Sequence, residues 1–159
     1  RVTFTFEECD VVPLCQRVLA SVSQARKSEN EFIFECDRES MDTRTDTQRL
    51  QQVIINLLSN ADKFTRNGKI TLGLKVDEKQ REVLFSVSDT GTGIPLEKQK
   101  LVFERFEKLN EYVQGTGLGL SICKLTVEKW GGEIWVDPGY TDGARFVFTH
   151  PLDIEQPKK

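Results

Sequence analysis

The stretch TQRLQQVIINLLSNADKFT, Thr47 to Thr65, decides the architecture of this chain. At ~100° per residue its apolar side chains fall within an arc of roughly 140°, which is typical of a helix that covers a core. Those side chains are Leu50, Val53, Ile54, Leu57, Leu58, Ala61 and Phe64. A polar stripe beside them consists of Gln52, Asn56, Asn60 and Lys63. The stretch therefore predicts an amphipathic helix with a distinctive polar edge.

The two asparagines of this stripe need a chemical reason, because Asn is a mediocre helix former. An amide oxygen suits Mg²⁺, which keeps several waters and takes further ligands from substrate phosphates. Lys63, two turns beyond Asn56, can place an ammonium group near a phosphate. A solvated helix face with incidental asparagines explains the stripe equally well at this point.

Composition limits the class of protein. A chain of 159 residues, 38% hydrophobic and 30% charged, suits one globular domain. The net charge of -3 gives no basic footprint for nucleic acid. We expect no membrane contact by this fragment, because no run has the length of a membrane span and no signal peptide opens the chain. The four scattered cysteines predict reduced thiols of a cytoplasmic domain.

The order of elements predicts an α+β fold. Expected strands are Val2–Phe6, Glu31–Cys36, Lys69–Val76, Arg81–Ser88, Glu133–Val136 and Ala144–Thr149. Expected helices are Asp10–Arg26 with Asp10 as N-cap, the stretch quoted above, and Leu118–Trp130. Thr43–Asp46 leads into the long helix, which Asp46 or Thr47 caps and Asn67-Gly68 ends. This order is no regular βαβ alternation, so we expect a mixed or antiparallel sheet covered by helices on one face.

Two glycine-rich loops follow. In SDTGTGIP, Asp89 ends a strand, and Gly91 and Gly93 permit tight turns and a close approach of the backbone. A carboxylate there can accept from the exocyclic amine of adenine and disfavours the carbonyl of guanine. In GTGLGL, Gly115 to Leu120, amides at a helix N-terminus can bind an anion. Taken singly, the loops could be an ordinary Asp-Gly loop and a helix-entry turn.

The segment LEKQKLVFERFEKLNEYVQ between the two loops is bracketed by glycines and could close over a ligand as a lid. Phe103 and Phe106 would anchor it, while Arg105 and Lys108 could reach a terminal phosphate. Alternatively, both phenylalanines are core residues and the cations are solvated. With the asparagine stripe, the loops and the lid indicate a pocket for a nucleoside triphosphate and its metal.

The order of NLLSNADKFT, SDTGTGIP, FERFEKL and GTGLGLSI resembles the N, G1, F and G2 boxes of sensor histidine kinases. Their catalytic, ATP-binding domain belongs to the superfamily of DNA gyrase, heat-shock chaperone and mismatch-repair ATPases. The resemblance implies a two-layer α/β sandwich with a mixed, mostly antiparallel sheet and an ATP lid between the G1 and G2 loops.

The resemblance also implies ATP and Mg²⁺ as cofactors. Asn56 would ligate Mg²⁺ with Asn60 beside it, Lys63 and Arg105 would act on the phosphates, and Asp89 would read the adenine amine. The implied nucleotide-binding positions are Asn60, Asp89, Gly91, Gly93, Ile94, Lys108, Gly115, Thr116, Gly117, Leu118 and Gly119. One departure is Gly143-Ala144, where the family often has a small hydroxyl residue.

One position bears on the reaction. Gyrase-like relatives carry a Glu one turn before the magnesium Asn, and here the corresponding residue is Gln52, which cannot activate water near neutral pH. The resemblance therefore implies phosphoryl transfer to a histidine on a separate dimerisation domain. His150 lacks the sequence context of such an acceptor and is read as a bystander. An ATP-hydrolysing relative and a non-enzymatic nucleotide-binding module remain the alternatives.

These expectations define the organisation of the chain. Residues 1–152 would form the ATP-binding domain, with 1–9 as the joint to an upstream dimerisation and phosphoacceptor domain of the same protein and 153–159 as a frayed tail. A response regulator receiver domain would be the second partner. We expect a monomeric fragment, while the full-length parent could be anchored in the inner membrane.

Overall fold

The computed structural model describes residues 3–104 and 119–152. The described helices are α1 (Val11–Arg26), α2 (Thr47–Lys63) and α4 (Gly119–Lys129), with the 3-10 turns η1 (Leu96–Lys98) and η2 (Leu101–Phe103). The described strands are β1 (Glu7–Asp10), β2 (Glu31–Cys36), β3 (Asp42–Thr45), β4 (Lys69–Asp77), β5 (Glu82–Asp89), β6 (Ile134–Val136) and β7 (Arg145–Pro151).

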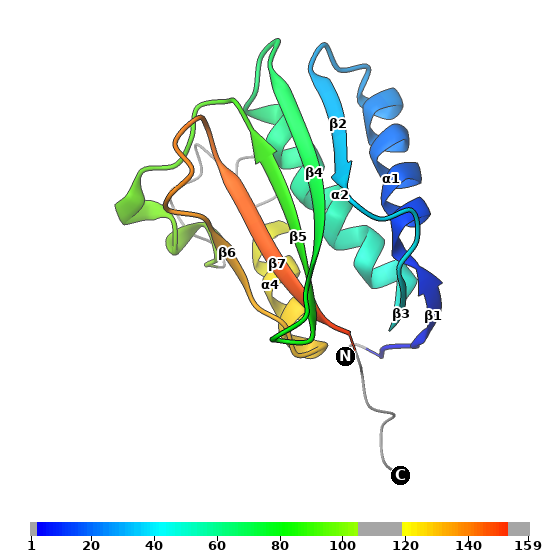
Figure 1. Ribbon diagram of the computed structural model, residues 1–159. Coiled ribbons are helices and arrows are strands. Elements are labelled where there is room, and N and C mark those ends of the chain that lie inside the picture. The colour runs from blue at the N-terminus through cyan, green and yellow to red at the C-terminus, as the bar shows by residue number, and fades with distance from the viewer. Residues whose placement is uncertain (1–2, 105–118, 153–159) are drawn as a thin grey trace.

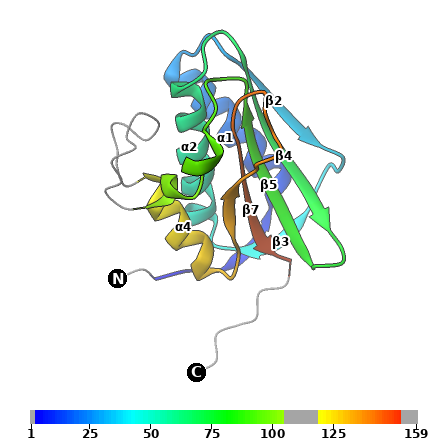
Figure 2. The ribbon, with the colours of Figure 1, turned by 90° about the vertical axis from the view of Figure 1, so that its left-hand side faces the viewer.

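A five-stranded sheet carries the fold, in the order β2-β4-β5-β7-β6. The pair β2–β4 is parallel, and β4–β5, β5–β7 and β6–β7 are antiparallel. Helices α1, α2 and α4 lie on one face of this sheet, as the two views at right angles show (Figures 1 and 2). The predicted two-layer α/β sandwich with a mixed, mostly antiparallel sheet is confirmed.

The core lies between the helices and the covered face of the sheet. Six of the seven apolar residues predicted for the buried face of α2 are buried, from Leu50 to Ala61, and Phe64 is half-buried. From the sheet, Phe85 of β5 stacks on Phe148 of β7 with ring centroids 4.6 Å apart. The helical period of the sequence therefore reported the buried side of α2 correctly, because burial of that side is what stabilises the helix.

Aspartates cap both long helices, as predicted. The Asp10 side chain accepts from the amide of Val12 at 3.2 Å and from that of Met41 at 2.9 Å. The Asp46 side chain accepts from the amide of Arg49 at 3.1 Å, and its second oxygen accepts from Thr5 at 2.8 Å. Each cap thus satisfies a helix amide and also fastens a distant segment of the chain.

The prediction of a first strand at Val2–Phe6 is wrong. Residues 3–6 belong to no strand, and the strand begins at Glu7. Phe4 and Phe6 pack against the core and lie 5.8 Å apart, and the Thr5 amide is bonded to Asp46. The apolar residues Phe4 and Phe6 of VTFTF therefore pack on the core from an irregular segment. Residues 3–6 of that segment are not paired with another strand.

A strand missed from the sequence is β3, which pairs with β1 in a separate two-stranded sheet. We expected the overlapping segment Thr43–Asp46 only to lead into α2, whereas the strand spans Asp42–Thr45. Thr43 and Thr45 are buried while Asp42 is exposed, so the alternation is present but carried by threonines. The strand depends on its partner β1, which sequence periodicity cannot supply.

Helix α2 ends earlier than expected. It stops at Lys63, where Phe64 caps it, and not at Asn67-Gly68. The amide of Phe64 donates to Ala61 at 3.3 Å and that of Thr65 to Asp62 at 3.4 Å, so the last turn tightens before the chain leaves the helix. Asn67 adopts a φ of 49° in the turn that leads to β4. Asn67-Gly68 therefore lies in a turn, as predicted, but it does not end the helix.

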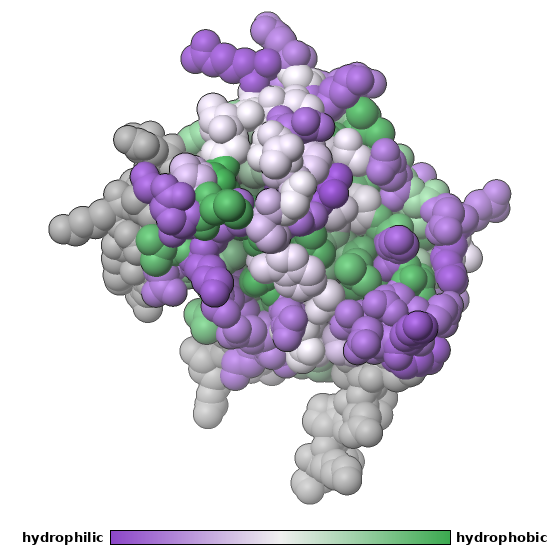
Figure 3. All heavy atoms as spheres, turned by 60° about the vertical axis from the view of Figure 1, so that its left-hand side comes forward, coloured by the Kyte–Doolittle hydropathy of each residue, from purple (hydrophilic) through white to green (hydrophobic). Residues whose placement is uncertain are grey.

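The remaining surface and thiols agree with a globular domain. Cys15 and Cys123 are buried, Cys9 and Cys36 are half-buried, and all four are free. On the face shown in Figure 3, hydrophobic residues form small groups separated by hydrophilic ones. None of the helices in the described part of the chain is both long and apolar enough to cross a lipid bilayer.

Candidate nucleotide-binding site

A cavity of about 130 Å³ lies between α2 and the beginning of α4. Its lining residues are Arg26, Asn56, Ser59, Asn60, Lys63, Gly119 and Leu120. It thus brings the predicted polar stripe of α2 together with the last glycine of the GTGLGL loop, which lies at least 56 residues further along the chain. Since liquid water occupies ~30 Å³ per molecule, the space suits a phosphoryl group or a hydrated cation.

The charge of this cavity is positive. Arg26 and Lys63 are its charged residues, and Asn56, Ser59 and Asn60 contribute neutral polar groups. No carboxylate belongs to its lining within residues 3–104 and 119–152. Arg26 is paired with Asp62, which lies outside the lining, so Lys63 gives the region its excess positive charge. An excess of positive charge attracts an anion, so the lining has the chemistry expected for phosphate.

Asn56 is held by neighbours on two elements. Its Nδ2 donates to the Sγ of Cys123 on α4 at 3.7 Å, and its Oδ1 accepts from Nε2 of Gln52 at 3.3 Å. Burial raises the pKa of the Cys123 thiol to about 12, against a smaller lowering by the Asn56 bond, so the sulfur stays neutral. The contact fixes which way the Asn56 amide turns and leaves its oxygen on the side of Gln52.

The side chain of Asn60 indicates whether the cavity suits a phosphorylated ligand. Its Nδ2 atom is buried and has no hydrogen-bond partner among the residues described. A buried donor without an acceptor costs about 1–3 kcal/mol. An oxygen of a phosphate entering the cavity would satisfy it, so the residues present fit a phosphorylated ligand, and the amide oxygens of Asn56 and Asn60 suit its Mg²⁺.

Gln52 lies outside the cavity lining but next to one of its residues. It is exposed and is not part of the cavity lining, although it contacts Asn56. The structure places Gln52 one turn before Asn56 and in contact with it, as the sequence predicts, and its role in the choice between water attack and transfer stays a prediction. The lining itself bears on that question, because among its described residues none can act as a carboxylate base.

Asp89 ends β5, as predicted, and only 1% of it is exposed. Its Oδ1 accepts from the amides of Gly91 at 2.9 Å and Ala144 at 3.1 Å. The backbone is also fixed, since the Asp89 amide donates to the Ala144 carbonyl at 2.8 Å and the Tyr140 hydroxyl donates to the Asp89 carbonyl at 3.0 Å. A buried carboxylate held this firmly is preorganised for recognition of a hydrogen-bond donor.

The glycines around Asp89 are required by close backbone approach. A Cβ on Gly91 would lie 2.1 Å from the Phe64 carbonyl oxygen, and one on Gly143 would lie 2.1 Å from the Asp89 carbonyl oxygen. Gly93 has a φ of +75°, which a side chain rarely permits. The predicted role of Gly91 and Gly93 in the turn is thus supported by geometry, and Gly143 is a third such position that the sequence did not reveal.

The Asp89 loop and the end of α2 are directly joined. The amide of Thr92 donates to the carbonyl of Phe64 at 3.3 Å, next to the contact made by Gly91. Ile94, further along the loop, packs against the core and accepts from Nε2 of Gln99 at 3.1 Å. The loop therefore contacts Phe64, the residue that follows Lys63 in the chain. The Asp89 carboxylate and the cavity thus lie in one region of the molecule.

Several predicted site residues lie outside the described residues. They are Arg105, Lys108, Gly115, Thr116, Gly117 and Leu118, together with Phe106. Phe103 is described and buried, with its ring 5.9 Å from that of Phe146 at 85°. Its predicted anchoring role is therefore supported by its packing against β7.

Sequence reasoning missed three residues of this region. Arg26 and Ser59 line the cavity, and Cys123 orients Asn56. Cys123 lies one turn after Gly119 on the helix that follows the second glycine loop, so a helical projection of that loop's helix could have found it. Arg26 is the last residue of α1, and nothing in its sequence context indicates α2 as its neighbour.

Known proteins share this arrangement. Residues 45–154 match the family described as histidine kinase-, DNA gyrase B-, and HSP90-like ATPases. The adaptive-response sensory kinase SasA of Microcystis aeruginosa is 38% identical over 144 residues, covering 87% of this chain and 37% of SasA. The chain therefore spans little more than a third of the length of that relative.

Solved structures agree. The nucleotide-free catalytic domain of histidine kinase ThkA is 32% identical with a TM-score of 0.82, covering 96% of this chain and all of that domain. ThkA was also solved with the response regulator TrrA, with a TM-score of 0.77 and 32% identity over 93% of this chain and 42% of that one. Full-length ShkA in complex with AMPPNP is 27% identical with a TM-score of 0.85, over 98% of this chain and 33% of ShkA.

The family match covers most of the chain, and the motifs that it spans are those that form the cavity and the Asp89 loop. This chain therefore belongs to the histidine kinase-, DNA gyrase B-, and HSP90-like ATPases, and its relatives within that family are histidine kinases.

Proposed function

We propose that this chain binds ATP with Mg²⁺ and donates the γ-phosphoryl group to a histidine on a separate dimerisation domain, in two-component signalling. The observation that carries the proposal is the cavity where the amides of α2 meet Gly119 of α4. It brings together cations, a buried donor that has no hydrogen-bond partner among the described residues, and a helix N-terminus. Asp89, on the adjoining loop, supplies the acceptor for the adenine amine.

Each group has a distinct task in this proposal. Asn56 and Asn60 hold Mg²⁺ with their amide oxygens, and Lys63 neutralises phosphate charge. When bound, Mg²⁺ neutralises charge on the phosphate oxygens and orients the chain of phosphates. Arg105 and Lys108 would contact the terminal phosphate, and Gly115, Gly117 and Gly119 would bring backbone amides to it. Phosphoryl transfer depends mainly on such positioning.

Transfer is favoured over hydrolysis by the lining of the cavity. Water attack needs a base, and the described lining offers amides, a hydroxyl and cations but no carboxylate. The terminal phosphoryl group would then be transferred to a stronger nucleophile that a separate domain supplies. Gln52, which contacts Asn56 from one turn earlier on α2, offers an amide and no base either.

His150 cannot be that nucleophile without unfolding. It is 1% exposed, its ring packs 4.8 Å from that of Trp130, and burial lowers its pKa to about 4. The acceptor histidine is therefore assigned to an upstream dimerisation and phosphoacceptor domain of the same protein. In keeping with this, residues 1–152 form the ATP-binding domain, with 1–9 leading from the acceptor domain.

A receiver domain of a response regulator is the proposed second partner. ThkA, which shares this fold at 32% identity, was solved in complex with the response regulator TrrA. Ile122 and Leu125 of α4 are 46% and 62% exposed, so this helix has apolar side chains available for contact with a partner domain.

Calorimetric titration with AMPPNP, with and without Mg²⁺, tests the binding step. We expect Mg²⁺-dependent binding that Asn56→Ala and Asn60→Ala each weaken by at least about tenfold, because each removes a ligand from a charged group. Gln48→Ala is the matched control, since Gln48 is an exposed residue of the same helix and lies outside the cavity. Equal affinities for all four proteins would refute the site.

The catalytic step needs a second assay. The chain is mixed with a separately produced dimerisation domain and γ-labelled ATP, and the label is followed on the acceptor histidine. Transfer of label supports the kinase. Binding without transfer would favour the nucleotide-binding module, and release of inorganic phosphate at a comparable rate would favour the hydrolase.

A further inference from the structure

Arg26 stands out because it lines the nucleotide cavity from a helix that carries none of the four motifs. It is the last residue of α1, whereas the rest of the lining comes from α2 and α4. Its Nε donates to Oδ2 of Asp62 on α2 at 2.6 Å. Its side chain is 38% exposed, and its Nη atoms make no hydrogen bond to another residue of the described ranges. One edge of the guanidinium is thus held while the other edge is available.

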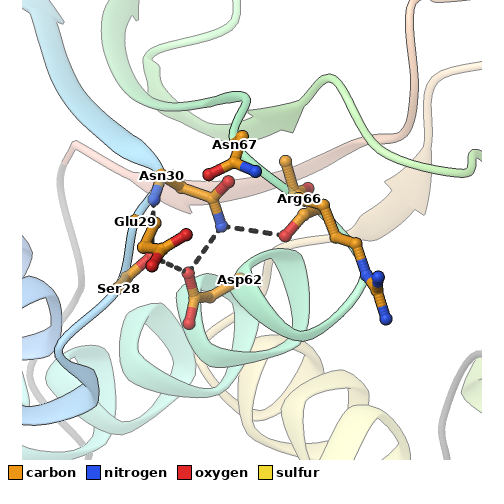
Figure 4. Close-up of a pocket in the computed structure, with 7 residues that line it drawn as sticks. Ser28, Glu29, Asn30, Asp62, Arg66 and Asn67 are labelled. Carbon is orange, nitrogen blue, oxygen red and sulfur yellow. Dashed lines mark hydrogen bonds between the residues drawn. The ribbon is translucent and has the colours of Figure 1, made fainter.

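Asp62, which holds that edge, is itself fixed on the opposite side (Figure 4). Its Oδ1 accepts from the hydroxyl of Ser28 and from Nδ2 of Asn30 at 2.8 Å. Asn30 in turn donates from Nδ2 to the Thr65 carbonyl at 3.0 Å and accepts from the Gly68 amide at 2.8 Å. The loop after α1 and the end of α2 are therefore tied together through one carboxylate.

The Asp62 side chain is only 9% exposed, and it accepts hydrogen bonds from Arg26, Ser28 and Asn30. A charge-assisted bond from Arg to a fixed carboxylate sets the plane of the guanidinium as well as its position. Asp62 therefore limits the directions in which Arg26 can point.

We propose that Arg26 is a phosphate-binding residue of the nucleotide site and that Asp62 is the residue that positions it. This inference rests on the proposed nucleotide site and adds a residue from α1 to it. Arg26 lines the cavity together with Lys63, so the two cations reach a polyphosphate from different helices. A planar guanidinium fits phosphate oxygens better than an ammonium does, and this gives Arg26 a role that Lys63 cannot replace.

Affinities for MgATP, MgADP and AMP test this proposal, measured by calorimetry on the whole chain. We expect Arg26→Gln to weaken MgATP by about tenfold, the effect of one lost charge-assisted contact, and AMP by much less. Arg38→Gln is the matched control, because Arg38 is also a partly exposed arginine paired with a carboxylate, Glu78, but lies outside the cavity. A thermal melt confirms that each variant is folded.

The positioning role of Asp62 has its own readout. Asp62→Asn keeps the shape of the side chain, and we expect it to weaken MgATP several-fold when residue 26 is Arg and to change nothing when residue 26 is Gln. If Asp62 acted only as a nearby negative charge, its removal would strengthen MgATP binding in both backgrounds, and that result would overturn the positioning role.

The outcomes separate this inference from the proposed function. If the wild-type chain binds MgATP and Arg26→Gln binds it equally well, Arg26 is only a helix-to-helix tie and the inference fails alone. If Arg26→Gln weakens AMP as much as MgATP, the residue supports the fold of the site and does not contact the outer phosphates. If the wild-type chain binds no adenine nucleotide, the proposed function fails first.

Discussion

Replacing Asp89 by Asn changes one charge and almost no volume at the centre of the proposed adenine contact. The Asn amide oxygen can take the place of Oδ1 and keep the bonds from Gly91 and Ala144, which are 2.9 and 3.1 Å long in the native protein. The NH₂ group then replaces the other carboxylate oxygen. A donor stands where an acceptor is required by the exocyclic amine of adenine.

The size of the effect follows from that exchange. A hydrogen bond to a charged group contributes about 1.5–3 kcal/mol, so MgATP affinity should fall by about 10- to 100-fold. The same NH₂ group can donate to the carbonyl of guanine, so MgGTP should lose nothing or gain. The preference for MgATP over MgGTP should therefore be lost. The fold should be unchanged, because the bonds from the Gly91 and Ala144 amides are kept.

The assay is calorimetric titration of MgATP and MgGTP into the native chain and the variant. Asp77→Asn is a matched control, because Asp77 ends the partner strand β4 and its carboxylate also accepts two backbone amides, each at 3.1 Å. It lies at the other end of the hairpin. If Asp89→Asn kept the native preference for ATP over GTP, Asp89 would not read the base and the orientation proposed for the nucleotide would be wrong.

Three further predictions concern the reaction, pH and packing. Gln52→Glu places a carboxylate next to Asn56 and should raise ATP hydrolysis by at least about tenfold through base catalysis, whereas Gln48→Glu, one turn earlier on the same helix, should not; equal rates of phosphate release would contradict this. His150 has a pKa of about 4, below the ordinary 6.5, so the unfolded chain binds its proton first and stability is lost as pH falls below 6.5. Urea titrations should show about 2.5 kcal/mol of this loss by pH 4.5, and His150→Gln should lack that part of the pH dependence. Gly143→Ala should cost about 2 kcal/mol of unfolding free energy in the same assay, because its Cβ would meet the Asp89 carbonyl oxygen at 2.1 Å; an unchanged midpoint would show that the loop yields without strain.

Local chemistry explains which parts of the fold were predictable. The buried face of α2 and the N-caps Asp10 and Asp46 depend on neighbours within a few residues, and these were predicted correctly. The strand β3 depends on pairing with β1, which is more than 30 residues away, and it was missed. Its alternation uses threonines, which are equally common in loops that lead into a helix.

The candidate site divides in the same way. Asn56, Asn60 and Asp89 could be selected because they stand in ordered motifs that together resemble the boxes of sensor histidine kinases, although each motif alone allows a structural reading. Arg26 could not, since its approach to the cavity depends on how α1 packs on α2. Gly143 likewise needs a glycine only because it touches Asp89, 54 residues earlier in the sequence.

A crystal structure of this chain grown with AMPPNP and Mg²⁺ is the most direct test of the proposed site. The purine should lie with its exocyclic amine on Asp89, and the phosphates should extend into the cavity between α2 and Gly119, with the metal beside the amides of Asn56 and Asn60. Nucleotide density in any other place, or a purine turned away from Asp89, would contradict the assignment.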